Sequence, residues 1–324
     1  MANVIYANAR AVSSMRSLLG IDRLFRMADA GANGALKILA EVNFGEGVAA
    51  DALGYETLMN AEEKKLIAFI KEAAPSEKLM RFFLAPNDYH NAEAAMRAKY
   101  LKTDISPMLT EEGLYSAETL REKIFADEYG GFPKPLAEAL QKADVLFVAK
   151  KADGKTVSAL FKKALYADLF ELSSSDKLLK TVYRVKADAA DIAVAFRSRS
   201  FASAKEQFVA GGSLSGEELR LLCEESPEVI REKFRYSDAR DLIFAAAEDF
   251  SEGRPLADFE RIADGCALKF LKKEKYDDGG CRPFLMYCYY KYAELLNVRI
   301  VMSSLNNGLA GDAIKARLRE TYEG

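Results

Sequence analysis

The sequence lacks tryptophan and has one histidine, eight prolines and four cysteines in 324 residues. A single imidazole excludes a histidine-rich metal site, because such a site needs several imidazole ligands. The cysteines form no CxxC pair and all lie in the last third of the chain, at Cys223, Cys266, Cys281 and Cys288. A core of this size needs no disulfide bonds, so we expect reduced, mostly buried thiols in a cytoplasmic protein.

The chain also lacks an excess of one charge and a long hydrophobic run. Lys and Arg number 46 against 49 Asp and Glu, which gives a net charge of −3. Binding of nucleic acid or acidic lipid relies on a positive field, so neither is expected as a partner. The longest apolar run, residues 283–290, is far shorter than the ~20 residues that span a bilayer. Residues 1–15 lack a basic start before an apolar stretch, so we expect no secretory signal.

Patterns typical of β-strands are almost absent. Long stretches are rich in Ala, Leu, Glu and Lys, with apolar residues at helical spacing. This composition and periodicity predict an all-α fold. Residues 145–149 resemble a strand, but in this context we expect them to end a helix.

A polar pair spaced three residues apart occurs three times along the chain. The pairs are Asp88 with Asn91, Asp188 with Asp191, and Glu294 with Asn297. Around each pair, the positions two before the second residue, and one, four and five after it, are apolar, aromatic or small. These positions share one face of an α-helix, so the same buried stripe is predicted three times.

A second pattern follows each stripe: a turn, a leucine, and small or acidic residues that open a helix. The leucines are Leu114, Leu214 and Leu309. The spacing from the second polar residue to the leucine is 23 residues in the first two copies and 12 in the third. Chain-breaking residues lie near positions 128 and 227. We therefore predict three similar helical units at residues 1–128, 129–227 and 228–324.

No pattern predicts a catalytic, cofactor-binding or metal-binding residue. The string GKT at residues 154–156 is the one phosphate-loop-like sequence, but Ala149 stands where a Walker A loop requires its first glycine. His90 is expected near a helix N-terminus that Asp88 caps. We expect no cofactor and no metal.

Residues 283–305 are apolar nearly all round and are interrupted mainly by Lys291, Glu294 and Arg299. A helix without a polar face must be buried by neighbours on several sides, which predicts a central helix. The alternative is that its aromatic residues also contribute to a partner surface. These candidate contact residues are Phe284, Tyr287, Tyr289 and Tyr290.

Several strings occur in a recognisable order. They are YANAR (6–10), SLL (17–19), DYHN (88–91), RAK (97–99), PFLMY (283–287), ELLNVRIV (294–301), NGL (307–309) and IKARLR (314–319). Their order and spacing resemble the family of C-type subunits of V-type ATPases, whose eukaryotic equivalents are the d-type subunits. The resemblance extends over the whole chain, although residues 130–240 are generic.

The resemblance implies three similar helical domains in a pseudo-threefold funnel. It implies a non-catalytic central-stalk subunit of a V-type ATPase or ATP synthase, which couples the rotating shaft to the membrane proteolipid ring during ion transport. The implied partners are the D-type and F-type shaft subunits and the ring, and the implied location is cytoplasmic, peripheral on the membrane through the complex. Two alternatives are an unrelated helical-repeat adaptor that binds proteins on a concave face, and an enzyme with scattered site residues.

Overall fold

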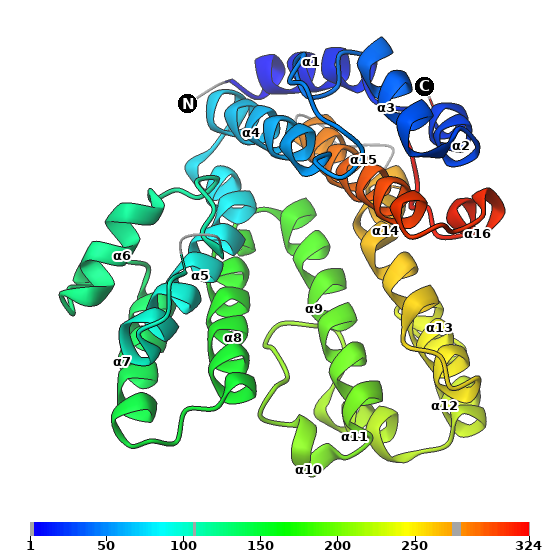
Figure 1. The fold of residues 1–324 in the computed structure, drawn as a ribbon. Coiled ribbons are helices and arrows are strands. Elements are labelled where there is room, and N and C mark those ends of the chain that lie inside the picture. The colour runs from blue at the N-terminus through cyan, green and yellow to red at the C-terminus, as the bar shows by residue number, and fades with distance from the viewer. Residues whose placement is uncertain (1–2, 106–107, 274–279, 324) are drawn as a thin grey trace. The chain divides into compact units, whose positions relative to one another are not determined.

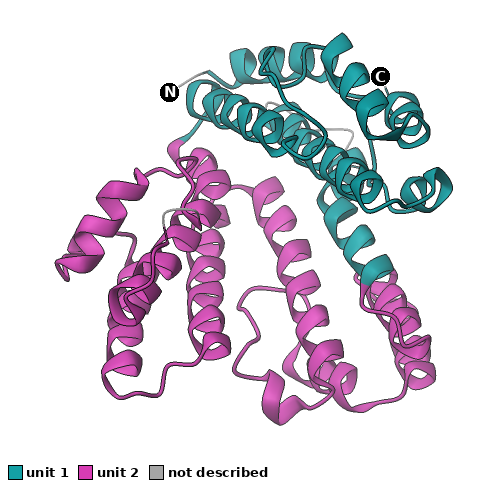
Figure 2. Cartoon of the chain, viewed as in Figure 1, with its two compact units in different colours: residues 1–76, 257–324 teal, residues 77–256 magenta. Residues whose placement is uncertain are grey.

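The computed structural model describes residues 3–105, 108–273 and 280–323, and in these ranges it contains helices and loops but no strand (Figure 1). The predicted all-α class is therefore confirmed. The chain divides into two compact units (Figure 2). Unit 1 comprises residues 1–76 and 257–324, and unit 2 comprises residues 77–256. Both ends of the chain thus belong to unit 1, whereas the division at residues 128 and 227 and the funnel stay predictions.

Unit 1 is built around the 25-residue helix α15 (Arg282–Asn306), which lies beside α1 and α4 in Figure 1. Six further helices contact it: α1 (Val4–Met15), α2 (Ile21–Asp29), α3 (Gly31–Glu41), α4 (Glu56–Ala73), α14 (Ala257–Lys273) and α16 (Gly311–Lys315). Because neighbours cover it on several sides, the prediction of a central helix over residues 283–305 is confirmed.

The sequence of α15 explains both its ends and its packing. Pro283 stands in the first turn, where its missing N–H would have no helical partner anyway. Gly308 adopts a φ of 74°, which lets the chain turn away just after the helix. Along the helix, the ring of Phe284 stacks on Phe69 of α4 with centroids 5.5 Å apart, and Tyr287 meets the same ring edge-on at 4.5 Å. Such aromatic pairs add about 0.5–1.5 kcal/mol each beyond the area that they bury.

Unit 2 contains three long helices and a set of shorter ones. The long helices are α5 (Glu77–Leu101), α8 (Gly154–Ser173) and α9 (Lys177–Ser198). The shorter ones are α6 (Ala117–Phe125), η2 (Tyr129–Gly131), α7 (Lys134–Val148), α10 (Phe201–Ala204), α11 (Gly216–Glu224), α12 (Pro227–Lys233) and α13 (Arg240–Ser251). Helix α5 packs against α6, α7 and α8, while α9 packs against α8, α11 and α13. Helix α7 ends at Val148, as predicted for residues 145–149.

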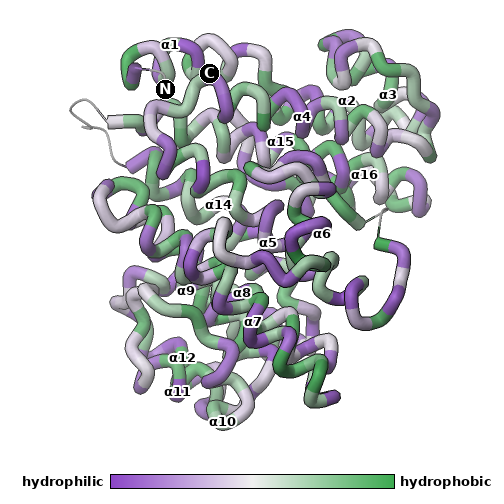
Figure 3. Tube along the Cα trace, turned by 90° about the vertical axis from the view of Figure 1, so that its left-hand side faces the viewer, coloured by the Kyte–Doolittle hydropathy of each residue, from purple (hydrophilic) through white to green (hydrophobic). Residues whose placement is uncertain are grey.

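The three predicted stripes lie on buried faces of α5, α9 and α15. All three polar pairs are buried, and so are the apolar stripe positions apart from the half-buried Ala189. Figure 3 shows hydrophilic and hydrophobic residues alternating along the helices, which is the pattern that one-sided packing produces. Each unit thus buries polar side chains, three residues apart in the sequence, among apolar neighbours.

Burial on α15 predicts a large cost for shortening its side chains. Leu285 is fully buried, whereas Leu53 of the same unit is 81% exposed. Leu285→Ala should lower the free energy of unfolding by about 2–5 kcal/mol, because it removes packed methyl groups and leaves a cavity. Leu53→Ala makes the same chemical change at the surface and should stay within about 0.5 kcal/mol of the parent protein. Urea unfolding followed by circular dichroism measures both, and equal losses would contradict the central position of α15.

Candidate functional site

The first residue of each polar pair is a carboxylate, and in unit 2 it binds backbone N–H groups of a returning loop. Asp88 on α5 accepts hydrogen bonds from the N–H groups of Leu114 and Tyr115, at 3.0 and 3.2 Å. Asp188 on α9 accepts them from Ser213 at 2.6 Å and Leu214 at 3.4 Å, and the Ser213 hydroxyl donates to its other oxygen at 2.6 Å. Leu114 and Leu214 are the leucines that the sequence pattern matched. The first two copies of the sequence pattern therefore make the same kind of hydrogen bond between the helix carboxylate and the loop.

Glycine precedes the bound loop residues in both copies because the carboxylate comes very close. A Cβ on Gly113 would lie 2.2 Å from Asp88 Oδ1, and a Cβ on Gly212 would lie 2.6 Å from Asp188 Oδ1. Both distances are shorter than any non-bonded carbon–oxygen contact, so a side chain at either position would displace the carboxylate. The glycines therefore belong to the loop contact itself.

The third carboxylate, Glu294 on α15, binds a different part of the chain. It accepts a hydrogen bond from the N–H of Leu19, 275 residues away, and not from the segment around Leu309. Leu19 stands just before α2, a helix of nine residues, and α6 and α11 after the other two contacts also have nine residues. In the third copy the N-terminal segment therefore provides the N–H group that Leu114 and Leu214 provide in the first two.

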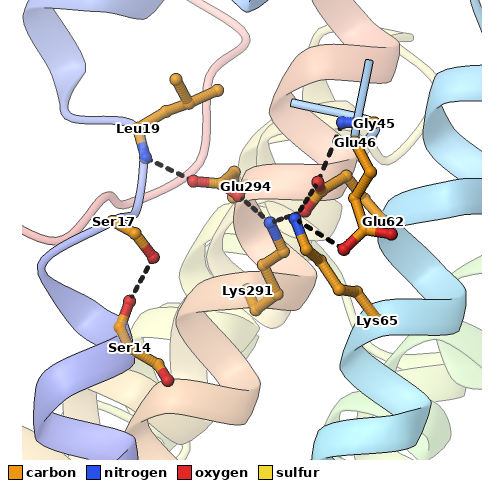
Figure 4. A network of polar contacts seen from close by, with 9 residues as sticks. All are labelled: Ser14, Ser17, Leu19, Gly45, Glu46, Glu62, Lys65, Lys291 and Glu294. Atoms are coloured by element: carbon orange, nitrogen blue, oxygen red, sulfur yellow. Dashed lines mark hydrogen bonds and ion pairs between the residues drawn. The ribbon is translucent and has the colours of Figure 1, made fainter. Parts of the chain in front are cut away.

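Glu294 is also part of a buried ionic network, shown in Figure 4. Lys291 Nζ lies 2.5 Å from Glu294 Oε1 and 2.5 Å from Glu62 Oε2 of α4. Glu62 Oε1 accepts further hydrogen bonds from Gly45 N–H at 2.9 Å and from Lys65 at 3.0 Å. Three ionised groups can share this interior because each is paired and hydrogen-bonded.

Burial and pairing shift the pKa values of this network in opposite directions. Burial alone would raise the pKa of Glu62, but Lys291, the Gly45 N–H and Lys65 together lower it below its ordinary value. Burial alone would lower the pKa of Lys291, but its two carboxylate partners raise it. For Glu294 burial dominates and raises the pKa, since Lys291 and the Leu19 N–H offset it only in part. The network therefore holds α4, α15 and two loops together through charge.

The second residue of each pair binds the backbone at another point, which in unit 2 lies earlier in the same loop. Asn91 accepts a hydrogen bond from Thr110 N–H at 2.9 Å and donates one to Thr110 O at 2.6 Å. Asn297 does the same with Arg319, at 2.7 and 3.1 Å. Asp191 accepts a hydrogen bond from Val209 N–H at 2.8 Å. These side chains fasten loops, which accounts for polar residues in an apolar stripe.

Unit 2 carries a groove of about 1040 Å³ between α7, α8 and the segment 203–210. Its apolar lining includes Leu146, Leu160 and Val209, together with Val145, which is 68% exposed. Its charged lining residues are Lys142, Lys155, Lys163, Glu138 and Glu206. A groove that combines apolar side chains with charged groups of both signs is a surface that can bind another protein. Sequence patterns did not reveal this groove, because its residues come from three separate segments.

The aromatic residues singled out as a candidate partner surface lie inside unit 1. Phe284, Tyr287, Tyr289 and Tyr290 are all buried, and Tyr290 also contacts the ring of Tyr322 edge-on at 5.4 Å between centroids. Their contact with a partner stays a prediction. The pairing of Lys291 with Glu62 was missed, although a lysine within an apolar helix signals a buried partner.

The other candidates for chemistry have structural positions. Residues 154–156 form the first turn of α8, where Asp153 caps the helix and accepts a hydrogen bond from Thr156 N–H at 2.8 Å. His90 lies in the middle of α5, and Asp88 binds a loop, so the expected N-terminal position of His90 was wrong. The four cysteines are buried, as expected. Within the described ranges, no group of three or more His, Cys, Asp or Glu side chains is placed to hold a metal ion.

The fold and these contacts define a class: an all-helical protein whose buried carboxylates and amides hold backbone loops, with one lysine shared by two of the carboxylates. Among its described helices, none combines the length and hydropathy needed to cross a bilayer. The model of the ATP synthase (C/AC39) subunit family matches residues 7–317. The chain belongs to this family, which confirms the resemblance drawn from its motifs.

A curated relative extends this result. The C-type subunit of the V-type sodium ATPase of Enterococcus hirae is 18% identical over 276 residues, which cover 83% of each chain. The similarity therefore extends across both units described above.

The ionic network predicts a pH-dependent defect in Lys291→Met. Two buried carboxylates would lose their shared cation, so the free energy of unfolding should fall by about 3–5 kcal/mol at pH 7. Without the cation, the folded-state pKa of the carboxylates rises above the unfolded value of about 4.3, so the folded state binds protons more readily. The variant should therefore regain stability as the pH falls from about 7 to about 5.

Urea unfolding at several pH values measures this recovery. Lys65→Met is the matched control, because Lys65 contacts Glu62 but is 42% exposed. Its loss should be about 1 kcal/mol or less. A loss in Lys291→Met that did not change with pH would count against a charged network.

Proposed function

We propose that this chain is a non-catalytic central-stalk subunit of a V-type ATPase or ATP synthase, acting as the socket between the rotor shaft and the membrane proteolipid ring. The observation that carries the proposal is the family match over residues 7–317. The Enterococcus hirae relative belongs to a V-type sodium ATPase, which supports the same machine. The proposed partners are the D-type and F-type shaft subunits and the ring.

The absence of catalysis is part of this proposal, and the use of the buried polar groups supports it. A buried acid with a shifted pKa is often a catalytic residue. Here Asp88, Asp188 and Glu294 bind loop N–H groups, and Glu62 binds Lys291. The shifted pKa values of Asp188, Glu294 and Glu62 therefore have a structural cause. The chain would take part in ion transport through rotation and not through bond chemistry.

The unit 2 groove is the surface that we propose for the shaft. A joint that carries torque needs an apolar area for affinity and charged groups that fix orientation. The groove offers Leu146, Leu160 and Val209 as the apolar part, with Lys142 and Lys155 on its rim. We propose an acidic helical segment of a shaft subunit as the occupant, because the three lysines outnumber the glutamates Glu138 and Glu206 along the groove. The proposed location is peripheral on the membrane, through the assembled complex.

The repeated loop contacts support three related helical units in a funnel, which we retain as a proposal. Asp88 and Asp188 bind their loops in the same way, and Glu294 binds the segment before a helix of the same length. The competing proposal is a helical-repeat adaptor unrelated to a rotary ATPase. It predicts binding to peptides or proteins but no dependence of ion transport on this chain.

The groove proposal predicts weaker shaft binding after charge reversal. Lys142→Glu with Lys155→Glu should raise the Kd for the purified shaft complex about 10–100-fold, because two attractive rim contacts become repulsive. Biolayer interferometry at low salt measures this change. Lys177→Glu with Lys180→Glu reverses two exposed lysines of α9 outside the groove and should leave the Kd unchanged. Equal effects in both pairs would rule out the groove as the specific contact.

The socket role is tested in the assembled ATPase. Vesicles carrying complexes with the Lys142→Glu and Lys155→Glu variant should hydrolyse ATP but pump fewer ions per ATP than the parent complex. Complexes that lack the chain should hydrolyse ATP without pumping. Coupled pumping in the absence of this chain would show that the socket proposal is wrong.

A further inference from the structure

Three equivalent helix positions carry Asn91, Asp191 and Asn297, and the chemistry of the middle one differs. Each asparagine uses its oxygen to accept a loop N–H and its amide nitrogen to donate to the carbonyl of the same loop residue. Asp191 accepts the corresponding N–H from Val209. A carboxylate has no hydrogen for the second contact, whereas a protonated carboxyl group has one O–H donor and the same shape as an amide.

The surroundings of Asp191 determine which form it takes. The side chain is buried on α9, with Asp188 one turn earlier on the same helix and Tyr183 also on that helix. From α8, Lys162 and Lys163 attract its charge, but burial lowers the pKa of Lys162 itself and Arg197 acts in the same direction. Burial is the largest influence on Asp191 and raises its pKa to about 7, against the opposing effect of the Val209 N–H and the two lysines.

We propose that Asp191 is a proton-binding site whose proton completes, at the middle position, the two-bond loop contact that Asn91 and Asn297 make through their amides. With the proton bound, the carboxyl group can donate to the loop carbonyl while it accepts from Val209 N–H. Without it, the carboxylate has no hydrogen to offer the loop carbonyl, and the segment 199–215 is held less firmly. The ligand of this site is a hydrogen ion from neutral solution.

The proton site borders the unit 2 groove. Val209, whose N–H binds Asp191, lines the groove together with Ala210, Glu206 and Lys163. Loosening of this segment therefore changes one wall of the groove. Any consequence for shaft binding rests on the proposed function, but the proton site itself does not.

Linkage fixes the sign of the expected pH dependence. The folded-state pKa of Asp191 lies above the unfolded value of about 3.9, so the closed segment prefers the protonated form. Local opening that hydrates Asp191 should therefore become up to about tenfold more frequent per pH unit between about pH 5 and pH 7, and should level off above that. The same opening should not depend on pH where the carboxyl group is replaced by an amide.

The experiment is native-state hydrogen exchange of the Val209 amide in the full chain, corrected for the intrinsic pH dependence of exchange. The parent protein should lose protection as the pH rises from 5 to 7, and Asp191→Asn should keep high protection throughout. Titration of the ¹³C-labelled Asp191 carboxyl group by NMR, assigned with Asp191→Asn, should give a midpoint of about 7. A midpoint below about 5, or equal pH dependence in both proteins, would overturn the proposal.

A reciprocal variant tests the same chemistry at another position. Asn91→Asp should make protection of the Thr110 amide depend on pH in the same sense, with recovery on acidification even if the variant is unstable at pH 8. Lys162→Met separates the proposal from a simple ion pair. It should raise the Asp191 midpoint and leave Val209 protection at pH 5 unchanged, whereas loss of protection at pH 5 would mean that a charged Asp191 pairs with Lys162. None of these measurements depends on shaft binding. Failure of the proton site can therefore be told apart from failure of the groove as the shaft contact.

Discussion

The structure depends on one requirement: backbone N–H groups of loops that return onto a helical core must find acceptors there. Asp88 and Asp188 meet it by binding two adjacent N–H groups each from within apolar stripes. A buried carboxylate costs free energy, but charge-assisted bonds to several N–H groups offset much of that cost. Loop N–H groups buried without an acceptor would also cost free energy, and they would not fix the position of the loop. These contacts hold the loop just before α6 and α11, and Ser116 and Ser215 then cap those helices.

The same requirement joins the two ends of the chain. Glu294 accepts from Leu19, so the segment before α2 is held by a helix near the C-terminus. Lys291 and Glu62 extend this contact to α4, and a cation shared by two carboxylates ties three segments at once. Unit 1 is consequently discontinuous in sequence. Its stability depends on contacts between residues near the N-terminus and the helix α15 near the C-terminus. Loops that close over such distances cost more entropy than the local loops of unit 2.

Local features of this fold were predictable and distant pairings were not. The periodic positions around Asn91, Asp191 and Asn297 gave the buried faces of α5, α9 and α15, because helical spacing is written in neighbouring residues. The partner of Glu294 was not predictable, since no pattern connects it to Leu19. His90 was misplaced for a related reason: Asp88 suits a helix cap, and its burial in mid-helix follows from a loop 26 residues away. The groove likewise depends on how α7 and α8 meet the segment 203–210.

The buried ionisable residues of this protein show two kinds of pKa shift. Glu62 and Lys291 are shifted toward their charged forms by each other, and their charges persist across neutral pH. Asp191 has a raised pKa because burial outweighs the hydrogen bond from Val209 N–H and the attraction of Lys162 and Lys163. Closely paired charges provide a rigid core, whereas the single carboxyl group at an asparagine-like position can change its bonding with one proton.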